Sequence, residues 1–581
     1  MCGIIGYVGG REAAPILLNG LGKLEYRGYD SAGMATLYDG RIDVRKGVGK
    51  VVDIAPMLNF ASMGGSIGIA HTRWATHGRV TKENSHPHLS CNGEVAIVHN
   101  GIIENYEALR KRLEGEGHVF RSECDSETFA HLLEGQSLDE GYQIVSRRVE
   151  GSYAILALSN KERKLFAMRD GSPLHIGIGQ GEYFVASDRL AFVDHTDQAI
   201  YLEDGEHAIL DGRDLLTRLS LNGFRTHRAP SKIDWVVGSA DKESFKHFMQ
   251  KEIFETPQAL TYALGSSEDS IREVAEMIHN FDSVFLTGMG SSTHAAITAK
   301  YWFADVKRRV FTTDSSELEN EHLDEDCLVV AITQSGETKD TLDAMKYAKS
   351  KGAKVVGIVN NLGTSATRNA DKTLLQRSGP EIAVCATKTF QGQLMMLARL
   401  SEELGRLNGV DIEWHLEDVP DYVRGVLDSA GSIGRETERF CDVEKYFFIG
   451  NGINYPTAKE AALKFKEISY KYAEGMTGGF HKHGTISLVD SDFKTIAFIP
   501  PSGKNRVNIE SNIQEIRARN GEVLKVGFDE SCGIRLPDNI PERLTPFIFS
   551  TAGQLIAYYY ADRLGNDVDK PRHLAKSVTV R

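Results

Sequence analysis

Two stretches in the second half of the chain share one order of strand, small-residue loop and helix. The first stretch contains DSVFLTGMGSS (282–292), CLVVAITQSGET (327–338) and AKVVGIVNN (353–361). The second contains, in the same order, EKYFFIGNG (444–452), FKTIAFIPPSGKN (493–505) and EVLKVGF (522–528). The offset stays at about 162 to 168 residues, which indicates a duplicated domain. Strands that alternate with helices in this way predict two doubly wound α/β domains with parallel sheets.

Roughly the first 230 residues follow a different pattern, in which glycine-rich turns separate short strands. Strands are predicted at SIGIAH (66–71), EVAIVHNG (94–101), GSYAILALS (151–159) and YFVAS (183–187). Helices are predicted at ENYEALRKRLEGEG (104–117) and SETFAHLLEGQ (126–136). This mixture favours an α+β domain built on antiparallel sheets.

A chain of 581 residues is too long for a single hydrophobic core. A polar segment that contains glycine and proline separates the two patterns and is interpreted as a linker. The sequence therefore predicts a first domain at 2–227, the linker at 228–245, two further domains at 246–420 and 421–565, and a C-terminal tail at 566–581.

Charge and hydropathy exclude several classes of protein. The net charge of -13 argues against nucleic acid as a main partner, because phosphate backbones are bound by clustered lysine and arginine. No apolar run approaches the length of about 20 residues that spans a bilayer. The N-terminal sequence MCGIIGYVGG lacks the basic region and cleavage site of a signal peptide. We expect a cytoplasmic enzyme.

The seven cysteines are scattered, at positions 2, 91, 124, 327, 385, 441 and 532. None forms a C-x-x-C pair, so the sequence predicts reduced thiols and neither a metal site nor a disulfide framework. Cys2 differs from the others, because removal of Met1 would expose it as the first residue. The α-amino group of a terminal cysteine can then act as the general base for its own thiol.

Several loops of the first domain carry groups that suit an amino-acid substrate. Arg73 can hold a carboxylate with both guanidinium nitrogens, and Asp125 can pair with an ammonium group. The amide of Asn100 and the N–H of Gly101 are candidate oxyanion donors. Each of these residues alone is also compatible with an ordinary surface loop.

The segments MCGIIGY, LEYRGYDSAG, HTRWATHG, HNGIIENY and CDSET resemble, in this order, the class II glutamine amidotransferase domain over about residues 1–220. The resemblance implies an N-terminal-nucleophile fold of four layers (αββα), with Cys2 as nucleophile and Asn100 and Gly101 as the oxyanion hole. It also implies that a set of residues binds glutamine, namely Arg27, Arg73, Thr76, His77 and Asp125. Trp74 would gate the path of ammonia.

The repeated domains carry a candidate phosphate site and a row of charges. Hydroxyl-bearing residues at 333–338 precede a predicted helix, where backbone N–H groups and the dipole favour an anion. In the predicted helix 457–475, Glu460, Lys464 and Glu467 share one face, and the next loop holds His483. A serine- and threonine-rich helix cap and an exposed salt-bridge ladder remain the alternative interpretations.

These features resemble tandem sugar isomerase (SIS) domains. The segments KHFMQKEIFETPQAL, QSGET, GPEIAVCATKTF, NYPTAKEAALKFKEISY, HKHG and DVDKPRHLAKSVTV resemble, in order, the isomerising glutamine–fructose-6-phosphate aminotransferases over the whole chain. The resemblance implies a sugar-phosphate site made of Ser292, Thr333, Gln334, Ser335, Thr338, Val384 and Ala575. His483 would open the sugar ring, Lys576 would form a Schiff base, Glu467 would move the proton, and Lys464 and Glu460 would assist.

The family reaction converts L-glutamine and fructose 6-phosphate to glucosamine 6-phosphate and glutamate, toward UDP-N-acetylglucosamine. It implies no metal or organic cofactor, and the family is expected to form a homodimer. Two departures, Ala386 and the loop GFHKHGT (479–485), leave a different ketose phosphate as an alternative acceptor.

Two other classes of protein are alternatives to this interpretation. An amidophosphoribosyltransferase would need a diphosphate loop with paired acidic residues, and the second half of the sequence contains none. A non-catalytic sugar-phosphate sensor would have no use for Cys2.

Overall fold

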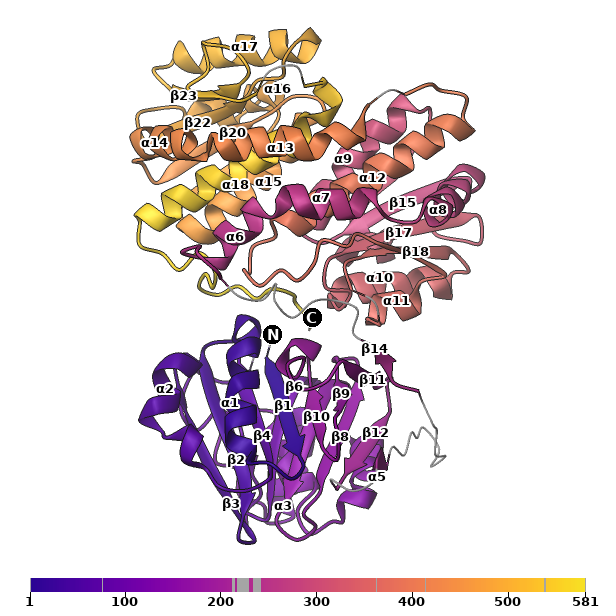
Figure 1. Ribbon diagram of the computed structural model, residues 1–581, viewed down its shortest axis with the longest axis vertical. Helices are drawn as coiled ribbons and strands as arrows, with labels where there is room; N and C mark the ends of the chain where they lie inside the picture. Colours follow the sequence, from indigo (N-terminus) through magenta and orange to yellow (C-terminus); the bar gives the residue numbers. More distant parts are fainter. Residues whose placement is uncertain are drawn as a thin grey trace. The chain divides into compact units, whose positions relative to one another are not determined.

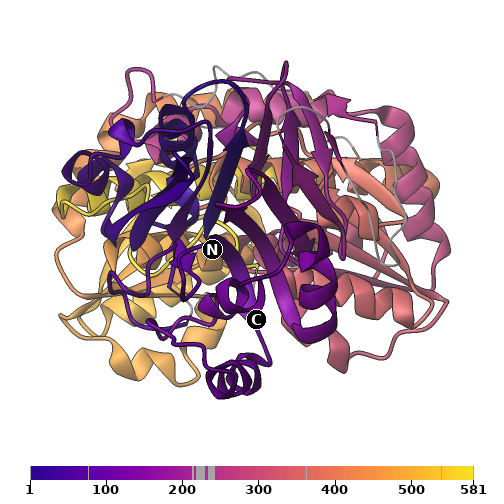
Figure 2. The same cartoon turned by 90° about the horizontal axis from the view of Figure 1, so that it is seen from below.

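A computed structural model describes residues 2–75, 77–211, 215–216, 229–232, 242–361, 363–412, 414–537 and 540–579. The chain forms two compact units: Met1–Val237 with Ala575–Arg581, and Gly238–Leu574 (Figures 1 and 2). Within the described ranges, no helix is both long and apolar enough to cross a bilayer.

The first unit contains two sheets in which all strand pairs are antiparallel. One sheet has the order β14 (Ser231–Lys232), β11 (Gln198–Tyr201), β9 (His175–Ile178), β10 (Tyr183–Ala186), β1 (Gly3–Val8), β4 (Ile67–Arg73), β2 (Ser31–Tyr38) and β3 (Arg41–Val48). The other has the order β13 (Leu215–Leu216), β12 (His207–Leu210), β8 (Leu165–Asp170), β7 (Gly151–Ser159), β6 (Val95–Ile103) and β5 (His88–Leu89).

Three apolar layers hold this unit together. Alternate residues of a strand point to opposite faces, so Ile5 and Tyr7 pack against the helices α1 (Ala13–Leu24) and α2 (Val51–Met57). Ile4 and Val8 pack between the two sheets. The outer face of the second sheet packs against α3 (Tyr106–Gly115), α4 (Glu127–Leu132) and α5 (Leu138–Arg148). The predicted αββα arrangement is confirmed.

The second unit contains two parallel sheets with the same strand order, 2-1-3-4-5 in order of appearance along the chain. The first sheet is β16 (Phe311–Asp314), β15 (Ser283–Gly288), β17 (Cys327–Thr333), β18 (Lys354–Val359) and β19 (Lys372–Leu375). The second is β21 (Tyr472–Met476), β20 (Lys445–Ile449), β22 (Phe493–Phe498), β23 (Glu522–Gly527) and β24 (Ile534–Arg535). This shared order confirms the predicted duplication.

Helices cover both faces of these sheets (Figure 1). They are α6 (Phe248–Phe254), α7 (Thr256–Leu264), α8 (Glu268–Asn280), α9 (Ser291–Asp305), α10 (Lys339–Ser350), α11 (Ser365–Asn369), α12 (Lys388–Leu407), α13 (Val419–Asp428), α14 (Ala430–Phe440), α15 (Asn454–Ser469), α16 (Gly478–His481), α17 (Gly503–Arg517) and α18 (Thr545–Arg563). One continuous core joins the two halves, since Leu286 and Leu328 of the first sheet and Tyr446 and Phe448 of the second belong to it. Both halves are doubly wound, as predicted.

The domain boundaries stay predictions. Most of the predicted linker 228–245 lies outside the described residues, and the predicted boundary between 420 and 421 falls in the first turn of α13.

The predicted helix 457–475 is too long. Helix α15 ends at Ser469, where Tyr470 takes a left-handed backbone conformation with a φ of 60°. The chain then forms the edge strand β21, which pairs with β20. The polar sequence of this segment suits an edge strand, so the local pattern does not distinguish it from the end of a helix.

The turns that follow β15 and β20 have matching glycines. Gly290 and Gly452 have φ values of 58° and 59°, which a side chain rarely allows. Gly288 ends β15 and Gly450 directly follows β20, and a Cβ at either position would meet the first turn of the next helix. A Cβ at Gly450 would lie 2.2 Å from the Asn454 carbonyl oxygen. The two halves therefore share a strand-to-helix turn that depends on glycine.

We expect Gly450→Ala to lower the free energy of unfolding of the second unit by about 2 kcal/mol or more, because the backbone must move to admit the methyl group. Thermal unfolding followed by circular dichroism measures the change. Gly431→Ala is the matched control, since Gly431 lies exposed on α14 with only the end of Arg435 near its Cβ position. That variant should be as stable as the parent or slightly more stable, and equal melting of both variants would contradict the proposed packing.

Candidate active site

Cys2 lies directly before β1, beside the end of β4. The pairing of Gly3 with Thr72 brings Cys2 next to the loop after Arg73. The Sγ atom of Cys2 accepts a hydrogen bond from the backbone N–H of Trp74 at 3.3 Å, and its thiol lies 3.4 Å from the Trp74 carbonyl oxygen. The half-buried thiol is thus held at the edge where the first sheet ends.

Side chains from two other segments converge on the Cys2 carbonyl oxygen. Asn100 of β6 donates from Nδ2 at 2.9 Å, and Arg27 donates from Nε at 3.2 Å. Gly101 follows with a φ of 131°, and a Cβ there would lie 1.8 Å from the Ser152 carbonyl oxygen. This position therefore requires glycine, and the structure brings together Cys2, Arg27, Trp74, Asn100 and Gly101.

The protonation state of Cys2 follows from its surroundings. Burial raises the pKa of the Cys2 thiol, and the hydrogen bond from the Trp74 N–H and the charge of Arg73 oppose this effect only in part. The thiol is therefore protonated near neutral pH and needs a base to become a nucleophile. Burial also lowers the pKa of His71 to about 3, so the nearby imidazole is neutral.

Arg73 and Asp125, two of the residues predicted to bind glutamine, lie at the end of β4 and beside the end of β6. Arg73 is buried and donates to the carbonyl oxygens of His77, Gly78 and Arg79. Asp125 is also buried, and its Oδ2 accepts the backbone N–H of Ile103 at 3.0 Å. Thr76 lies outside the described residues. Arg73 holds the 77–79 loop in this structure, and Asp125 is fixed at the end of β6.

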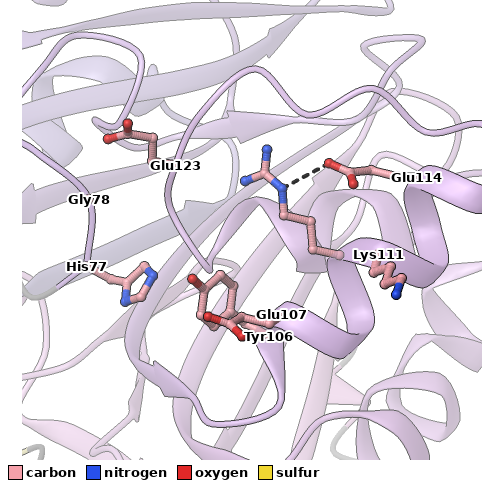
Figure 3. A pocket seen from close by; sticks show the side chains of 8 residues that line it. His77, Gly78, Tyr106, Glu107, Lys111, Glu114 and Glu123 are labelled. Atoms are coloured by element: carbon pink, nitrogen blue, oxygen red, sulfur yellow. Dashed lines mark hydrogen bonds and ion pairs between the residues drawn. The ribbon is translucent and has the colours of Figure 1, made fainter.

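A surface pocket of about 580 Å³ borders this loop (Figure 3). His77 and Gly78 form one wall and Tyr106 and Glu107 another, with the rings of His77 and Tyr106 4.4 Å apart. Neither Cys2 nor Asn100 lines the pocket. It is therefore a hollow beside the candidate reaction centre.

Two residues near Cys2 were not singled out from the sequence. His71 Nε2 lies 3.2 Å from Asn100 Oδ1 and 2.9 Å from the His99 carbonyl oxygen, so its N–H can orient the Asn100 amide. Asp30 accepts the backbone N–H of Ala75 at 2.8 Å and anchors the loop after Trp74. Both lie inside motifs noticed in the sequence, but only the fold shows which atoms they hold.

The second unit contains a buried group of charges at the contact between its halves. Lys464 Nζ lies 2.6 Å from Glu467 Oε2 and 3.6 Å from Glu460 Oε1. Glu460 also accepts a hydrogen bond from Ser291 Oγ at 2.8 Å, and its Oε2 lies 2.7 Å from His294 Nδ1. The predicted shared face of Glu460, Lys464 and Glu467 is confirmed. Because Glu460 and Lys464 are 0% and 1% exposed, an exposed salt-bridge ladder is excluded.

Burial and charge act against each other in this group. Burial alone would lower the pKa of Lys464, but the carboxylates of Glu467 and Glu460 outweigh it and raise that pKa. Burial alone would raise the pKa of Glu460, but Lys464 and His294 lower it overall. Lys464 and Glu460 are therefore both ionised near neutral pH.

The predicted phosphate loop lies at the N-terminus of α10, with Thr338 as its N-cap residue. Ser335 Oγ accepts the Glu337 N–H at 3.1 Å and lies 3.4 Å from Thr338 Oγ1. Thr333 Oγ1 accepts the Gly336 N–H at 3.3 Å. Ser292 lies in the first turn of α9, which follows the neighbouring strand β15. In a 2-1-3-4-5 sheet the crevice beside strands 1 and 3 is the usual ligand site, and both loops lie there.

The remaining predicted residues are placed as follows. The backbone N–H of Val384 donates to the Asp569 carbonyl oxygen, and Ala386 packs against the main core. Gln334 is half-buried in the phosphate loop. His483 is exposed, and in the part of the chain that the structure describes no hydrogen bond or ion pair joins its imidazole to Glu460, Lys464 or Glu467. Ala575 and Lys576 belong to the tail that groups with the first unit.

Comparison with protein families agrees with these two kinds of site. A glutamine amidotransferase domain matches residues 71–194, and a SIS domain matches residues 277–401 and again 440–531. The chain is thus an amidotransferase domain followed by tandem SIS domains.

Two archaeal relatives match over the full length of both chains. Each is a glutamine–fructose-6-phosphate aminotransferase (isomerising): that of Methanococcus maripaludis is 46% identical and that of Pyrococcus horikoshii 44% identical, each covering 100% of both chains. The solved C-terminal domain of glucosamine-fructose-6-phosphate aminotransferase from Francisella tularensis covers 57% of this chain and 100% of its own, with a TM-score of 0.53 and 32% identity. The chain belongs to the family of isomerising glutamine–fructose-6-phosphate aminotransferases.

The lowered pKa of Glu460 predicts a specific dependence of stability on pH. A carboxyl group whose pKa is lower in the folded state stabilises the fold above its unfolded value of 4.5, and this contribution is lost as the pH falls through the folded value. We expect Glu460→Gln to destabilise the second unit at pH 7, and the difference from the parent to shrink as the pH falls below 4.5.

Chemical denaturation at several pH values measures this difference. Glu444→Gln is the control, because Glu444 pairs with Lys471 at the surface and its side chain is 74% exposed. That change should alter the free energy of unfolding by no more than about 0.5 kcal/mol. If the free energy of unfolding of Glu460→Gln differed from that of the parent by the same amount at every pH, the lowered pKa of Glu460 would be contradicted.

Proposed function

We propose that the protein transfers the amide nitrogen of L-glutamine to D-fructose 6-phosphate and isomerises the product to D-glucosamine 6-phosphate, releasing L-glutamate. The observation that carries this proposal is the convergence of Trp74, Asn100 and Arg27 on Cys2. Family membership and the buried Glu460–Lys464–Glu467 group support the sugar half of the reaction.

In the glutaminase half, the terminal amine formed by removal of Met1 accepts the thiol proton of Cys2. The thiolate attacks the amide carbon of glutamine, and Asn100 Nδ2 and the Gly101 N–H stabilise the oxyanion. The intermediate collapses to a γ-glutamyl thioester and ammonia. Water then hydrolyses the thioester, which yields glutamate and restores the thiol.

Four other residues bind and enclose glutamine in this proposal. Arg73 and Asp125 hold its carboxylate and ammonium groups, with His77 and Thr76 beside them. Arg73 would exchange its present carbonyl partners for the carboxylate when glutamine binds. Trp74, whose backbone contacts the Cys2 sulfur, is suited to gate the departing ammonia.

In the sugar half, hydroxyl and backbone N–H groups of Ser292, Thr333, Gln334, Ser335 and Thr338 bind the phosphate. The position of these residues at or before the N-termini of α9 and α10 supports this part of the proposal. Val384 and Ala575 complete this site. His483 opens the ring, and the Lys576 amine condenses with the ketone at C2 to form an imine and water.

Ammonia then displaces the lysine at C2. Glu467 removes a proton from C1 and returns one to C2, which leaves an aldehyde at C1 and an amine at C2. Lys464 pairs with the carboxylate of Glu467, and Glu460 lies near the same ammonium group.

We also propose that the protein works as a cytoplasmic homodimer. Phe480 of α16 is 61% exposed and His483, in the turn that follows this helix, is exposed as well, so a second copy of the chain that packs here would cover a catalytic residue. Light scattering of the purified protein tests the dimer.

We expect Cys2→Ala to lower glutamine-dependent synthesis of glucosamine 6-phosphate by about 10³-fold or more, since the nucleophile is lost. Synthesis from added ammonium should persist, because the sugar site is unchanged. Cys327→Ala is the control and should keep both activities, as Cys327 lies at the start of β17 outside either site. Retention of glutamine-dependent synthesis by Cys2→Ala would refute the proposal.

We expect fructose 6-phosphate to give the highest kcat/KM among ketose phosphates, with a glucosamine 6-phosphate product identified by mass spectrometry. The panel matters because Ala386 supplies no hydroxyl to the acceptor site. A higher kcat/KM with another ketose phosphate, and no product from fructose 6-phosphate, would assign the same chemistry to that sugar.

A further inference from the structure

A cysteine, two histidines and a glutamate converge at one place in the first unit, away from the residues assigned above. The ligand atoms of Cys91, His118, His131 and Glu134 all lie within 4.8 Å of one another. Cys91 Sγ lies 3.8 Å from His118 Nδ1 and 3.6 Å from His131 Nδ1. Glu134 Oε2 lies 3.1 Å and 3.6 Å from the same two nitrogens. In both histidines, Nδ1 therefore faces Cys91 Sγ and Glu134 Oε2.

These separations match a tetrahedral zinc site. With zinc–sulfur bonds of about 2.3 Å and zinc–nitrogen or zinc–oxygen bonds of about 2.0 to 2.1 Å, ligand atoms lie about 3.3 to 3.6 Å apart. The four measured distances of 3.1 to 3.8 Å scatter around that range. One thiolate, two imidazoles and one carboxylate also form a donor set that suits zinc among the common metals.

Backbone N–H groups form hydrogen bonds to two of the four candidate ligands, as is common around metal sites. Glu134 accepts the backbone N–H groups of Cys91 at 3.0 Å and Asn92 at 3.1 Å, which fixes its carboxylate. The Cys91 sulfur accepts the Val119 N–H at 3.2 Å, which fixes the position of the sulfur. Ligating carboxylates and thiolates are commonly held by such outer hydrogen bonds.

The second nitrogen of His131 faces another carboxylate. His131 Nε2 lies 3.5 Å from Glu127 Oε1, and Glu127 is itself held by the backbone N–H groups of Arg121 and Ser122. A ligating histidine usually directs its other N–H to a carboxylate in this way, which fixes the ring. His131 is only 2% exposed, and carboxylates lie near both of its ring nitrogens: Glu134 near Nδ1 and Glu127 near Nε2.

We propose that Cys91, His118, His131 and Glu134 bind one structural Zn²⁺ ion. All four positions of the tetrahedron are filled by protein, so the ion would have no open position for substrate. It would join three segments, namely the turn after β5, the loop after α3, and α4. Helix α4 follows Asp125, so the ion would also stabilise the segment that presents Asp125 to glutamine.

A second group of donors, His86, His88 and Cys124, is a weaker candidate. All three are buried, but Lys46 Nζ donates to the carbonyl oxygens of Ser85 and Pro87 on either side of His86. Burial, followed by the charges of Lys46 and Arg73, lowers the pKa of His88, and these two positive charges would oppose a bound cation as well. The proposal therefore concerns the Cys91 group alone.

The zinc content of the purified full chain tests the proposal. Protein expressed with zinc in the medium should carry about one zinc per chain by mass spectrometry of the metal, and His118→Ala and Cys91→Ala should lose it. Cys124→Ala is the matched control and should keep it. Wild-type protein stripped with a chelator should take up one equivalent of Zn²⁺ again, and Co²⁺ in its place should show a sulfur-to-cobalt absorption band that Cys91→Ala lacks.

Wild-type protein that takes up no zinc in the stripped-and-reloaded experiment would overturn the proposal, even if a variant fails to fold. Zinc retained by Cys91→Ala but lost from Cys124→Ala would place the metal at the other cluster and also overturn it. Neither measurement involves glutamine or sugar, so a negative result leaves the proposed function unaffected.

Discussion

Lys464 and Glu460 lie buried where the two halves of the second unit meet, and the half-buried Glu467 pairs with the same lysine. A buried charge is costly unless it is paired and hydrogen-bonded, so Lys464 can stay charged only while Glu460 and Glu467 remain beside it. Glu460 in turn reaches across to Ser291 and His294 of α9. The same helix begins at Ser291 and carries Ser292 in its first turn, so the charges of the second half hold the start of α9, where we propose that part of the phosphate site lies.

In the first unit, strand pairing determines the position of Cys2, the nucleophile that we propose. Strand pairing between β1 and β4 sets Cys2 beside Trp74, and the second sheet supplies Asn100 from β6. Burial raises the pKa of the Cys2 thiol, so the thiol is protonated near neutral pH. In the reaction that we propose, a base must first remove this proton. A neutral His71, whose pKa is lowered to about 3 by burial, can orient the Asn100 amide without adding charge.

The fold was largely predictable because its signals are local and repeated. Strands that run into glycine turns mark β15 and β20, and the glycines keep matching backbone angles in both halves. The prediction that the helix continues beyond Ser469 is wrong, because a polar edge strand and a polar helix end have the same local pattern. Cys91, His118, His131 and Glu134 were missed for another reason. Their spacing matches no short metal motif, and only the packing of three separate segments brings their donor atoms together.

The central claim is that nitrogen freed at Cys2 is the nitrogen that reaches the sugar. Supplying glutamine labelled with ¹⁵N in its amide group, together with fructose 6-phosphate and unlabelled ammonium in the medium, tests it directly. Mass spectrometry should find glucosamine 6-phosphate that carries ¹⁵N. A product that carries mainly unlabelled nitrogen, or no amino sugar at all, would contradict the account.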